Sequence, residues 1–227
     1  MTVLWDNIDK VVYINLSHRK DRDESLQKQL KLLRVPPEKI VRFDACAHLL
    51  GHIGCTQSHL AVLNMAIENG WGTILVLEDD MCFNHTAQNS AALAWTLDTL
   101  GKLTWDVVLL SANYLHVVPL KSAPGLVKPL KAYCACAYIV NAHYLPILRD
   151  NYAASLNALL QDGQKHQFAL DVHWWARMAR DKWLGMYPVA GHQQPGCSDI
   201  EDGYMDYQPL FYKPLSEIAV TLSELQP

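Results

Sequence analysis

Thr73-Ile-Leu-Val-Leu-Glu-Asp-Asp80 is the stretch that best indicates how this chain folds. It opens with five residues that are apolar or β-branched and closes on three consecutive carboxylates. A short apolar run without alternation is typical of a strand that is buried on both faces of a parallel sheet. In an open α/β sheet, ligands bind beyond the carboxyl ends of such strands. Because adjacent carboxylates repel one another, we expect a divalent cation carrying a substrate phosphate to compensate their charge.

The segments on either side of this stretch alternate between strand and helix patterns. Apolar runs predict further strands at residues 10–16, 39–43, 105–110, 133–140 and 186–190. Helical spacing of apolar residues predicts helices at 21–34, at 60–67 after a glycine-containing turn at 51–59, at 87–100, at 142–150, from 171 onward and at 216–225. Residues 117–131 contain three prolines and form either a loop or a pair of edge hairpin strands. The pattern predicts one α/β domain with a central, mostly parallel sheet flanked by helices.

Composition excludes several classes of protein. Half of the 227 residues are hydrophobic, which argues against global disorder, and a net charge of −4 without a basic run argues against nucleic acid as a partner. No apolar stretch is long enough to predict a membrane span. The first residues lack the basic and then apolar pattern of a secretory signal, so we expect a cytoplasmic protein. The six cysteines have no framework spacing, which favours reduced thiols.

The three acids are expected to divide between two faces. Along a strand, Glu78 and Asp80 point the same way and Asp79 points to the opposite face. Glu78 and Asp80 then form an acid-x-acid pair that can hold Mg²⁺ or Mn²⁺ together with a donor hydroxyl or a coordinated water. The alternative interpretation is that the strand ends in a solvated acidic turn.

Three early motifs carry a resemblance to a known family. They are Val11-Val-Tyr-Ile-Asn-Leu16 with Arg19 and Arg22, then Gly54-Cys-Thr-Gln-Ser-His59, then Leu75-Val-Leu-Glu-Asp-Asp80. In this order they resemble glycosyltransferase family 25, which contains bacterial lipooligosaccharide galactosyltransferases and procollagen galactosyltransferases. Residues 137–142, Asp171 and residues 188–200 resemble its later landmarks, so the likeness spans roughly residues 11 to 200.

This resemblance implies a fold, a donor and a metal. The fold is the GT-A type, a nucleotide-sugar-binding α/β domain with a DXD-like acidic motif at the end of a central strand. The donor is a UDP-hexose (UDP-galactose or UDP-glucose), the cofactor is Mn²⁺ or Mg²⁺, and the sugar is transferred with inversion. We expect a single domain over residues 1–227, with a nucleotide-sugar half at 1–113, an acceptor-side half at 114–213 and a C-terminal tail at 214–227.

The resemblance also implies particular site residues, each at the position of this sequence that matches a family motif. Asp80 is the first candidate for a metal ligand, with Glu78 and His192 as further ligands. Gln193 or Gln194 is the alternative to His192 as the family landmark. Ser58 and His59 would lie in the first turn of a helix, where backbone N–H groups favour an anion. The residues expected at the donor are Asn15, Leu16, Arg19, Arg22, Ser58, His59, Glu78 and Asp79.

Four of these donor residues also have a structural interpretation. Arg19 and Arg22 are alternatively solvated charges at a helix start. His59 is alternatively a buried histidine that bonds to the sheet. Asn15 alternatively terminates its strand with a side-chain hydrogen bond. Trp174, Trp175 and Trp183 either stack on an acceptor sugar or belong to the core, and the core is favoured.

Inversion requires a general base opposite the leaving diphosphate. Asp171 is the candidate, because it follows apolar residues at a predicted helix start, where the carboxylate stays ionised; Asp199 is the second choice. Asp171 is alternatively only a helix N-cap.

The predicted function is transfer of galactose or glucose from UDP to a hydroxyl acceptor, either a lipooligosaccharide sugar or hydroxylysine of a collagen-like chain. Two alternatives remain. One is an inactive relative that binds a sugar or a protein. The other is a nucleotidyltransferase, which the absence of glycine from Ser17-His-Arg-Lys-Asp-Arg22 disfavours.

Overall fold

The fold is built around one twisted sheet. The structure, a computed structural model, describes residues 5–197 and 203–221. Within this part of the chain, seven strands form the main sheet in the order β11-β5-β7-β6-β3-β1-β2. Their bounds are β1 (Lys10–Asn15), β2 (Ile40–Asp44), β3 (Ile74–Glu78), β5 (Val107–Pro119), β6 (Leu126–Val140), β7 (Trp183–Met186) and β11 (Ala219–Val220). All neighbours pair in parallel except at β6, which runs antiparallel to β3, β5 and β7. The predicted α/β fold with a mostly parallel sheet is confirmed.

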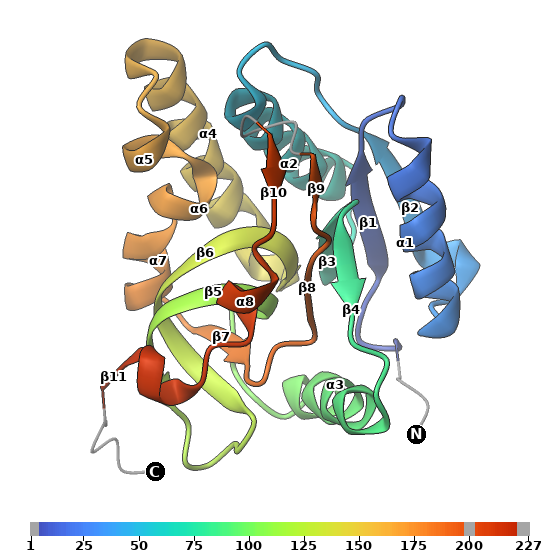
Figure 1. The fold of residues 1–227 in the computed structure, drawn as a ribbon, viewed down its shortest axis with the longest axis vertical. Coiled ribbons are helices and arrows are strands. Elements are labelled where there is room, and N and C mark those ends of the chain that lie inside the picture. The colour runs from blue at the N-terminus through green and yellow to red at the C-terminus, as the bar shows by residue number, and fades with distance from the viewer. Residues whose placement is uncertain (1–4, 198–202, 222–227) are drawn as a thin grey trace.

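Helices cover the sheet on its flanks. The long ones are α1 (Lys20–Leu32), α2 (Gly51–Glu68), α3 (Ala87–Leu100) and α4 (Leu145–Asp162), and the short ones are α5 (Lys165–Phe168), α6 (Leu170–His173), α7 (Trp175–Arg180) and α8 (Gln208–Phe211). In Figure 1, α1 lies beside β1 and β2, whereas α4 to α7 stack on the opposite side of the molecule. Helices α2 and α4 pack against each other. Among the described residues, no helix combines the length and apolar character needed to cross a membrane.

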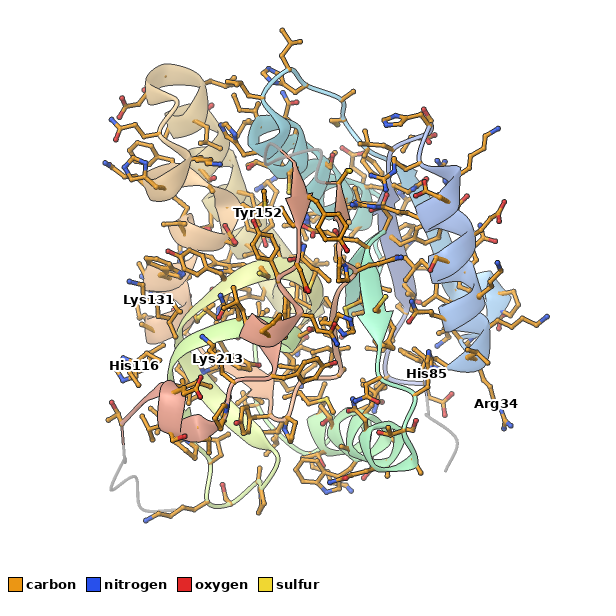
Figure 2. All side chains as sticks on the ribbon, in the orientation of Figure 1. Arg34, His85, His116, Lys131, Tyr152 and Lys213 are labelled. Carbon is orange, nitrogen blue, oxygen red and sulfur yellow. The ribbon has the colours of Figure 1, made fainter. Side chains whose placement is uncertain are left out.

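The side chains follow this layering. Val11, Leu75 and Val108 on the sheet are fully buried and belong to one continuous hydrophobic core. Tyr152 on α4 is also fully buried, while Arg34 and His116 extend outward from the edges of the fold (Figure 2). The continuous apolar runs of the sequence therefore correspond to strands that are covered on both faces.

Two small sheets lie beyond the carboxyl ends of β1 and β3. Strand β4 (Met81–Phe83) pairs antiparallel with β8 (Gly191–Gln193), and β9 (Gly196–Cys197) pairs with β10 (Tyr204–Met205). Gly191 is needed for the first of these pairings, because a Cβ there would lie 1.9 Å from the carbonyl oxygen of Cys82. The β4–β8 pair brings a segment from late in the chain next to the three acids (Figure 1).

Several expected boundaries differ from the structure. Residues 117–131 form the hairpin between β5 and β6, one of the two predicted alternatives. The predicted strand at 186–190 is wrong, because β7 ends at Met186 and the next strand begins at Gly191. The predicted helix at 216–225 is wrong as far as residue 221, since this segment forms a 3₁₀ turn at Leu215–Glu217 and then pairs with β5 as β11. Strand β5 runs continuously across the proposed division between residues 113 and 114.

Candidate active site

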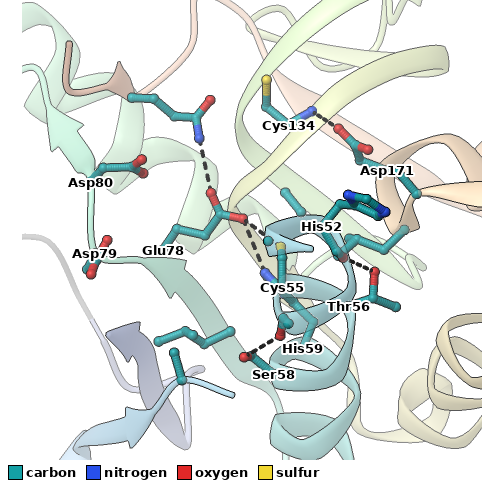
Figure 3. A pocket seen from close by; sticks show the side chains of 18 of the residues that line it. His52, Cys55, Thr56, Ser58, His59, Glu78, Asp79, Asp80, Cys134 and Asp171 are labelled. Atoms are coloured by element: carbon teal, nitrogen blue, oxygen red, sulfur yellow. Dashed lines mark hydrogen bonds and ion pairs between the residues drawn. The ribbon is translucent and has the colours of Figure 1, made fainter. Parts of the chain in front are cut away.

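A pocket of about 660 Å³ opens beyond the carboxyl ends of β1 and β3. Its wall is drawn from the ends of β1 and β3, the segment before α2, the first turns of α2, the middle of β6, α6 and β8. Figure 3 shows the acids of the β3 end on one side of this pocket and Asp171 on the other. This is the place where an open α/β sheet binds its ligands.

The three acids all line this pocket. Glu78 is the last residue of β3, and Asp79 and Asp80 form the turn that leads into β4. The strand alternation expected for Asp79 and Asp80 therefore does not apply, because the chain has left the strand before it reaches them. The acids still differ in their surroundings, and these surroundings indicate which of them can take a cation.

Asp79 is the acid with the most complete set of partners. Its Oδ1 lies 3.0 Å from Nη1 of Arg22, and its Oδ2 accepts a hydrogen bond of 2.8 Å from Nδ2 of Asn15. Burial raises the pKa of Asp79, and the Arg22 charge and the Asn15 hydrogen bond oppose that increase. Asp79 thus anchors the turn to β1 and α1.

Asp80 has an incomplete set of partners. Its Oδ2 lies 3.4 Å from Nη1 of Arg22, but its Oδ1 is buried and has no hydrogen-bond partner among the described residues. Burial, and after it the neighbouring charge of Glu78, raise the pKa of Asp80 to about 7, while the charge of Arg22 and a hydrogen bond from Gln193 oppose this increase. A buried carboxylate oxygen without a donor is costly unless a cation binds it. Asp80 is therefore the best-suited ligand for a hard divalent ion.

Glu78 is held from both sides. Its Oε2 accepts a hydrogen bond of 3.0 Å from Nε2 of Gln193. Its Oε1 lies 3.2 Å from Nε2 of His59 and 3.7 Å from Sγ of Cys55. These contacts fix the carboxylate at the pocket surface, beside Asp80 (Figure 3).

The expected position of Ser58 and His59 is wrong. Helix α2 begins at Gly51, so both residues lie in its interior and not in its first turn. Oγ of Ser58 donates to the carbonyl of Gly54 and accepts from the backbone N–H of Cys46, while His59 is fully buried. Within this helix, Gly54 allows the segment before α2 to pack closely, because a Cβ there would lie 2.4 Å from the carbonyl oxygen of Cys46. The two side chains line the pocket from below, without free backbone N–H groups for an anion.

The predicted donor residues at the end of β1 and just after it separate into two groups. Leu16 and Arg22 line the pocket, whereas Asn15 and Arg19 are not part of its lining. Asn15 is buried and uses its amide to bond Asp79, the carbonyl of Arg19 and the guanidinium of Arg42. Arg19 donates to Asp21. Asn15 thus organises the strand end, as its structural interpretation predicts.

His192 lies away from the acids. On β8, neighbouring residues face opposite sides, so Gln193 points to Glu78 while Nδ1 of His192 bonds to Oη of Tyr212 at 3.0 Å. His192 is not part of the pocket lining, whereas Gln193 and Gln194 are. The structure does not support the expected place of His192 in a metal shell, and Gln193 takes the position next to the acid pair.

Asp171 faces the acids across the pocket. It lies in the first turn of α6, whose N-cap is Ala169, so the interpretation of Asp171 as an N-cap is wrong. Its Oδ2 accepts a hydrogen bond of 2.9 Å from the backbone N–H of Cys134. The pKa of Asp171 is raised, mainly by burial and also by the Glu78 charge, while the Cys134 N–H opposes the increase. The helix start predicts the opposite direction, a carboxylate that stays ionised. Asp199, the second candidate base, lies outside the described residues.

The tryptophans belong mainly to the core. Trp174 and Trp183 are fully buried and pack edge to face against each other. Trp175 is partly buried, packs against Tyr133 and carries the ammonium of Lys131 over its ring at 3.9 Å. The core interpretation is confirmed for the first two.

Sequence reasoning missed Cys55 as a candidate pocket residue, and it missed the contact between Gln193 and Glu78. Cys55 was grouped with the structural thiols, although its spacing of four from His59 places both on one helix face. The contact of Gln193 with Glu78 has no local signal, because it joins residues that are 115 positions apart.

A sheet with carboxylates at the end of a central strand, and a pocket beyond them, is the arrangement that the GT-A type predicts. Residues 49–108 match the family model of glycosyltransferase family 25, described as an LPS biosynthesis protein. The matched segment contains the motifs at 54–59 and 75–80, and it confirms the predicted resemblance. The match supports the predicted enzyme class, a glycosyltransferase, over this segment of the chain.

Solved structures offer distant likenesses. An apo UDP-glucose pyrophosphorylase is 12% identical, with a TM-score of 0.46 over 81% of this chain and 75% of its own. The mannose-1-phosphate geranyltransferase from Thermus thermophilus is 10% identical, with a TM-score of 0.44 over 79% and 73%. A glycosyltransferase involved in glycosylation of the major capsid of PBCV-1 is 10% identical, with a TM-score of 0.37 over 78% and 92%. No curated protein matches the sequence.

Proposed function

We propose that this protein is an inverting, metal-dependent glycosyltransferase that moves galactose or glucose from a UDP-sugar to a hydroxyl acceptor. The observation that carries the proposal is the buried Oδ1 of Asp80, which has no donor among the described residues and lies at the acid cluster of the pocket. The family match over residues 49–108 supports the reaction class.

The acid cluster suits a hard divalent cation. Mg²⁺ and Mn²⁺ prefer oxygen ligands, and Asp80 offers an oxygen that nothing else in the described structure satisfies. Glu78 is the second ligand, since its carboxylate is fixed beside Asp80. The bound ion supplies charge neutralisation for the diphosphate that leaves with the nucleotide.

The rest of the pocket suits a nucleotide sugar. Its volume of about 660 Å³ falls within the range on the order of 300–1,000 Å³ that small-molecule sites occupy. Arg22 lies at its wall, where a guanidinium between Asp79 and Asp80 also faces the donor phosphates. Leu16 adds apolar wall at the end of β1.

Asp171 is the general base of the proposal. It lies on the wall opposite the acid cluster, so an acceptor hydroxyl between them meets Asp171 on the side away from the leaving diphosphate (Figure 3). A carboxylate whose pKa is raised by burial is a stronger base than a solvated one. The Cys134 N–H holds one of its oxygens, which leaves the other for the proton.

Donor binding tests the metal role without any acceptor. UDP is expected to raise the melting temperature of the wild type only when Mn²⁺ is present, and Asp80→Ala is expected to abolish that rise. Asp150→Ala removes an exposed acid from α4 and serves as the matched control, which should respond like the wild type. An unchanged UDP response in Asp80→Ala contradicts the metal role of Asp80.

Turnover assays test the reaction itself. Hydrolysis of UDP-galactose and UDP-glucose separates a transferase from an inactive relative, because turnover of neither donor favours a binding module. Asp171→Asn is expected to lose transfer while the UDP and Mn²⁺ melting response persists, since the amide keeps the Cys134 contact but cannot take a proton. Equal transfer rates in the variant and the wild type refute the role of Asp171.

The acceptor proposal stays at the level of two classes, a lipooligosaccharide sugar and hydroxylysine in a collagen-like chain. A mass-spectrometric screen with a glycan set and a hydroxylysine peptide distinguishes them by the mass of one added hexose on either acceptor.

A further inference from the structure

The pocket contains a second group of ligand-type side chains, next to the acid cluster. Cys55 and His59 are four residues apart on α2, so they lie on one helix face, and this face is turned toward Glu78 (Figure 3). Sγ of Cys55, a ring nitrogen of His59 and an oxygen of Glu78 all lie within 4.8 Å of one another. A thiol, an imidazole and a carboxylate are the three ligand types that zinc takes in proteins.

Two of the distances within this group, both from Glu78, are close to the edges of a metal tetrahedron, and the third is within 4.8 Å. With zinc bonds of about 2.3 Å to sulfur and about 2.1 Å to nitrogen and oxygen, tetrahedral angles place nitrogen and oxygen roughly 3.4 Å apart and sulfur and oxygen roughly 3.6 Å apart. The structure has 3.2 Å between Nε2 of His59 and Oε1 of Glu78, and 3.7 Å between Sγ of Cys55 and the same oxygen. Glu78 is therefore placed at nearly the distance from Cys55 and from His59 that shared binding of one zinc ion requires.

Neighbouring side chains hold two of these ligands in place. Nδ1 of His59 lies 2.8 Å from Oη of Tyr138, a fully buried side chain of β6, and this contact fixes the orientation of the imidazole ring. The second oxygen of Glu78 is held by Gln193 at 3.0 Å. Outer partners of this kind orient metal-binding histidines and carboxylates in known sites.

We propose that Cys55, His59 and Glu78 form a binding site for a thiophilic divalent ion of the Zn²⁺ class, distinct from the hard-ion site at Asp80. Three protein ligands leave the fourth position open to the pocket. On binding, the thiol proton of Cys55 passes to solvent, and His59 binds through Nε2 with its remaining proton on Nδ1, facing Tyr138.

Occupancy of this site opposes donor binding. Glu78 belongs to both sites, so an ion held by Cys55 and His59 withdraws this carboxylate from the ion at Asp80. A second dication this close also repels the first. The coupling is reciprocal, so that UDP with Mn²⁺ weakens the zinc-class site by the same factor. This second step rests on the proposed function, whereas the site itself does not.

Cobalt binding tests the site without any nucleotide. Co²⁺ added to the metal-stripped protein is expected to give a thiolate-to-cobalt charge-transfer band at one ion per chain, which Zn²⁺ abolishes. Cys55→Ser is expected to lose the band and to weaken Zn²⁺ binding at least about 100-fold, a larger effect than the loss of an outer partner. Cys46→Ser removes another thiol of the pocket wall and is expected to keep the band. No band in the wild type, or a band that persists in Cys55→Ser, overturns the proposal.

Alkylation of the unmutated protein provides a test that does not depend on the folding of a variant. Zn²⁺ is expected to slow modification of Cys55 selectively, measured by peptide mass spectrometry, while the exposed Cys197 reacts at the same rate with and without the ion. Equal rates at Cys55 under both conditions refute the site.

The coupling is measured separately. Zn²⁺ is expected to weaken UDP binding in Mn²⁺ for the wild type and to have no such effect on Cys55→Ser. Failure of the proposed function appears as no UDP response in the wild type while the cobalt band persists. Failure of the zinc-class site appears as a UDP response in the wild type without a cobalt band.

Discussion

Replacement of Asp80 by asparagine removes a carboxylate whose burial is costly at neutral pH. Burial raises its pKa from 3.8 to about 7, with Glu78 adding to the shift and Arg22 opposing it. Between these two pH values the folded protein keeps a proton on Asp80 that the unfolded chain has lost. The stability contributed by this group is therefore complete at low pH and is lost as the pH rises through about 7.

The magnitude follows from the linkage between proton binding and folding. Each pH unit between the two pKa values costs the wild type about 1.4 kcal/mol, so about 1.5 units below the folded pKa correspond to about 2 kcal/mol. The Asp80 side chain is only 15% exposed, so solvent screening reduces this value little. The variant Asp80→Asn does not titrate at this position. Its free energy of unfolding relative to wild type should thus increase by about 2 kcal/mol from about pH 5.5 to about pH 9.

Urea denaturation in the presence of EDTA at both pH values measures this difference. Comparison at each pH cancels the titration of groups that both proteins share, such as Asp171. Asp150→Asn, an exposed acid on α4, should show no pH-dependent difference from wild type. When Mn²⁺ replaces EDTA, the wild type should recover part of its lost stability at the higher pH, because the ion binds the ionised carboxylate. A difference between Asp80→Asn and wild type that stays constant from one pH to the other refutes the reasoning.

Two further changes test the packing around the pocket. Trp174→Ala should destabilise the protein by about 3–5 kcal/mol, because it empties a fully buried ring site and breaks the hydrogen bond to the carbonyl of Ala132. Urea denaturation measures this loss of stability, and a loss below about 1 kcal/mol contradicts the prediction. Gly54→Ala should lower the free energy of unfolding by about 1–3 kcal/mol and weaken UDP binding, because the added Cβ lies 2.4 Å from the carbonyl oxygen of Cys46 and displaces the pocket wall. Calorimetry with UDP and Mn²⁺ measures the affinity, and a wild-type affinity refutes this expectation.

The sheet could be predicted where the signal is local. The run at 74–77 is apolar at every position, as a buried strand needs, and β3 does lie between β1 and β6 in the interior of the sheet. The segment 216–225 shows the opposite case. Its apolar residues have helical spacing, but pairing with β5 at the sheet edge stabilises an extended segment at Ala219–Val220 instead. Local pattern cannot anticipate which exposed edge is available.

The site could be predicted only in part, for the same reason. The acids follow their strand in the sequence, so their location at the pocket was predictable. The choice between His192 and Gln193 was not, because it depends on the register of β4 with β8, a pair of three residues each. A register shift by one residue would exchange the two side chains. Strands of three residues each are too short for their sequence to fix this register.

The partners of the three acids also explain how one cluster can have separate roles. Asp79 has Arg22 and Asn15, so its charge is largely compensated and its role is to hold the turn. Glu78 has the amide of Gln193 and the buried His59, which fix its position. Asp80 shares Arg22 with Asp79 and keeps a buried oxygen without a donor among the described residues. A single guanidinium cannot neutralise three carboxylates, so the cluster retains negative charge toward the pocket, and Asp80 is where a cation relieves the largest cost.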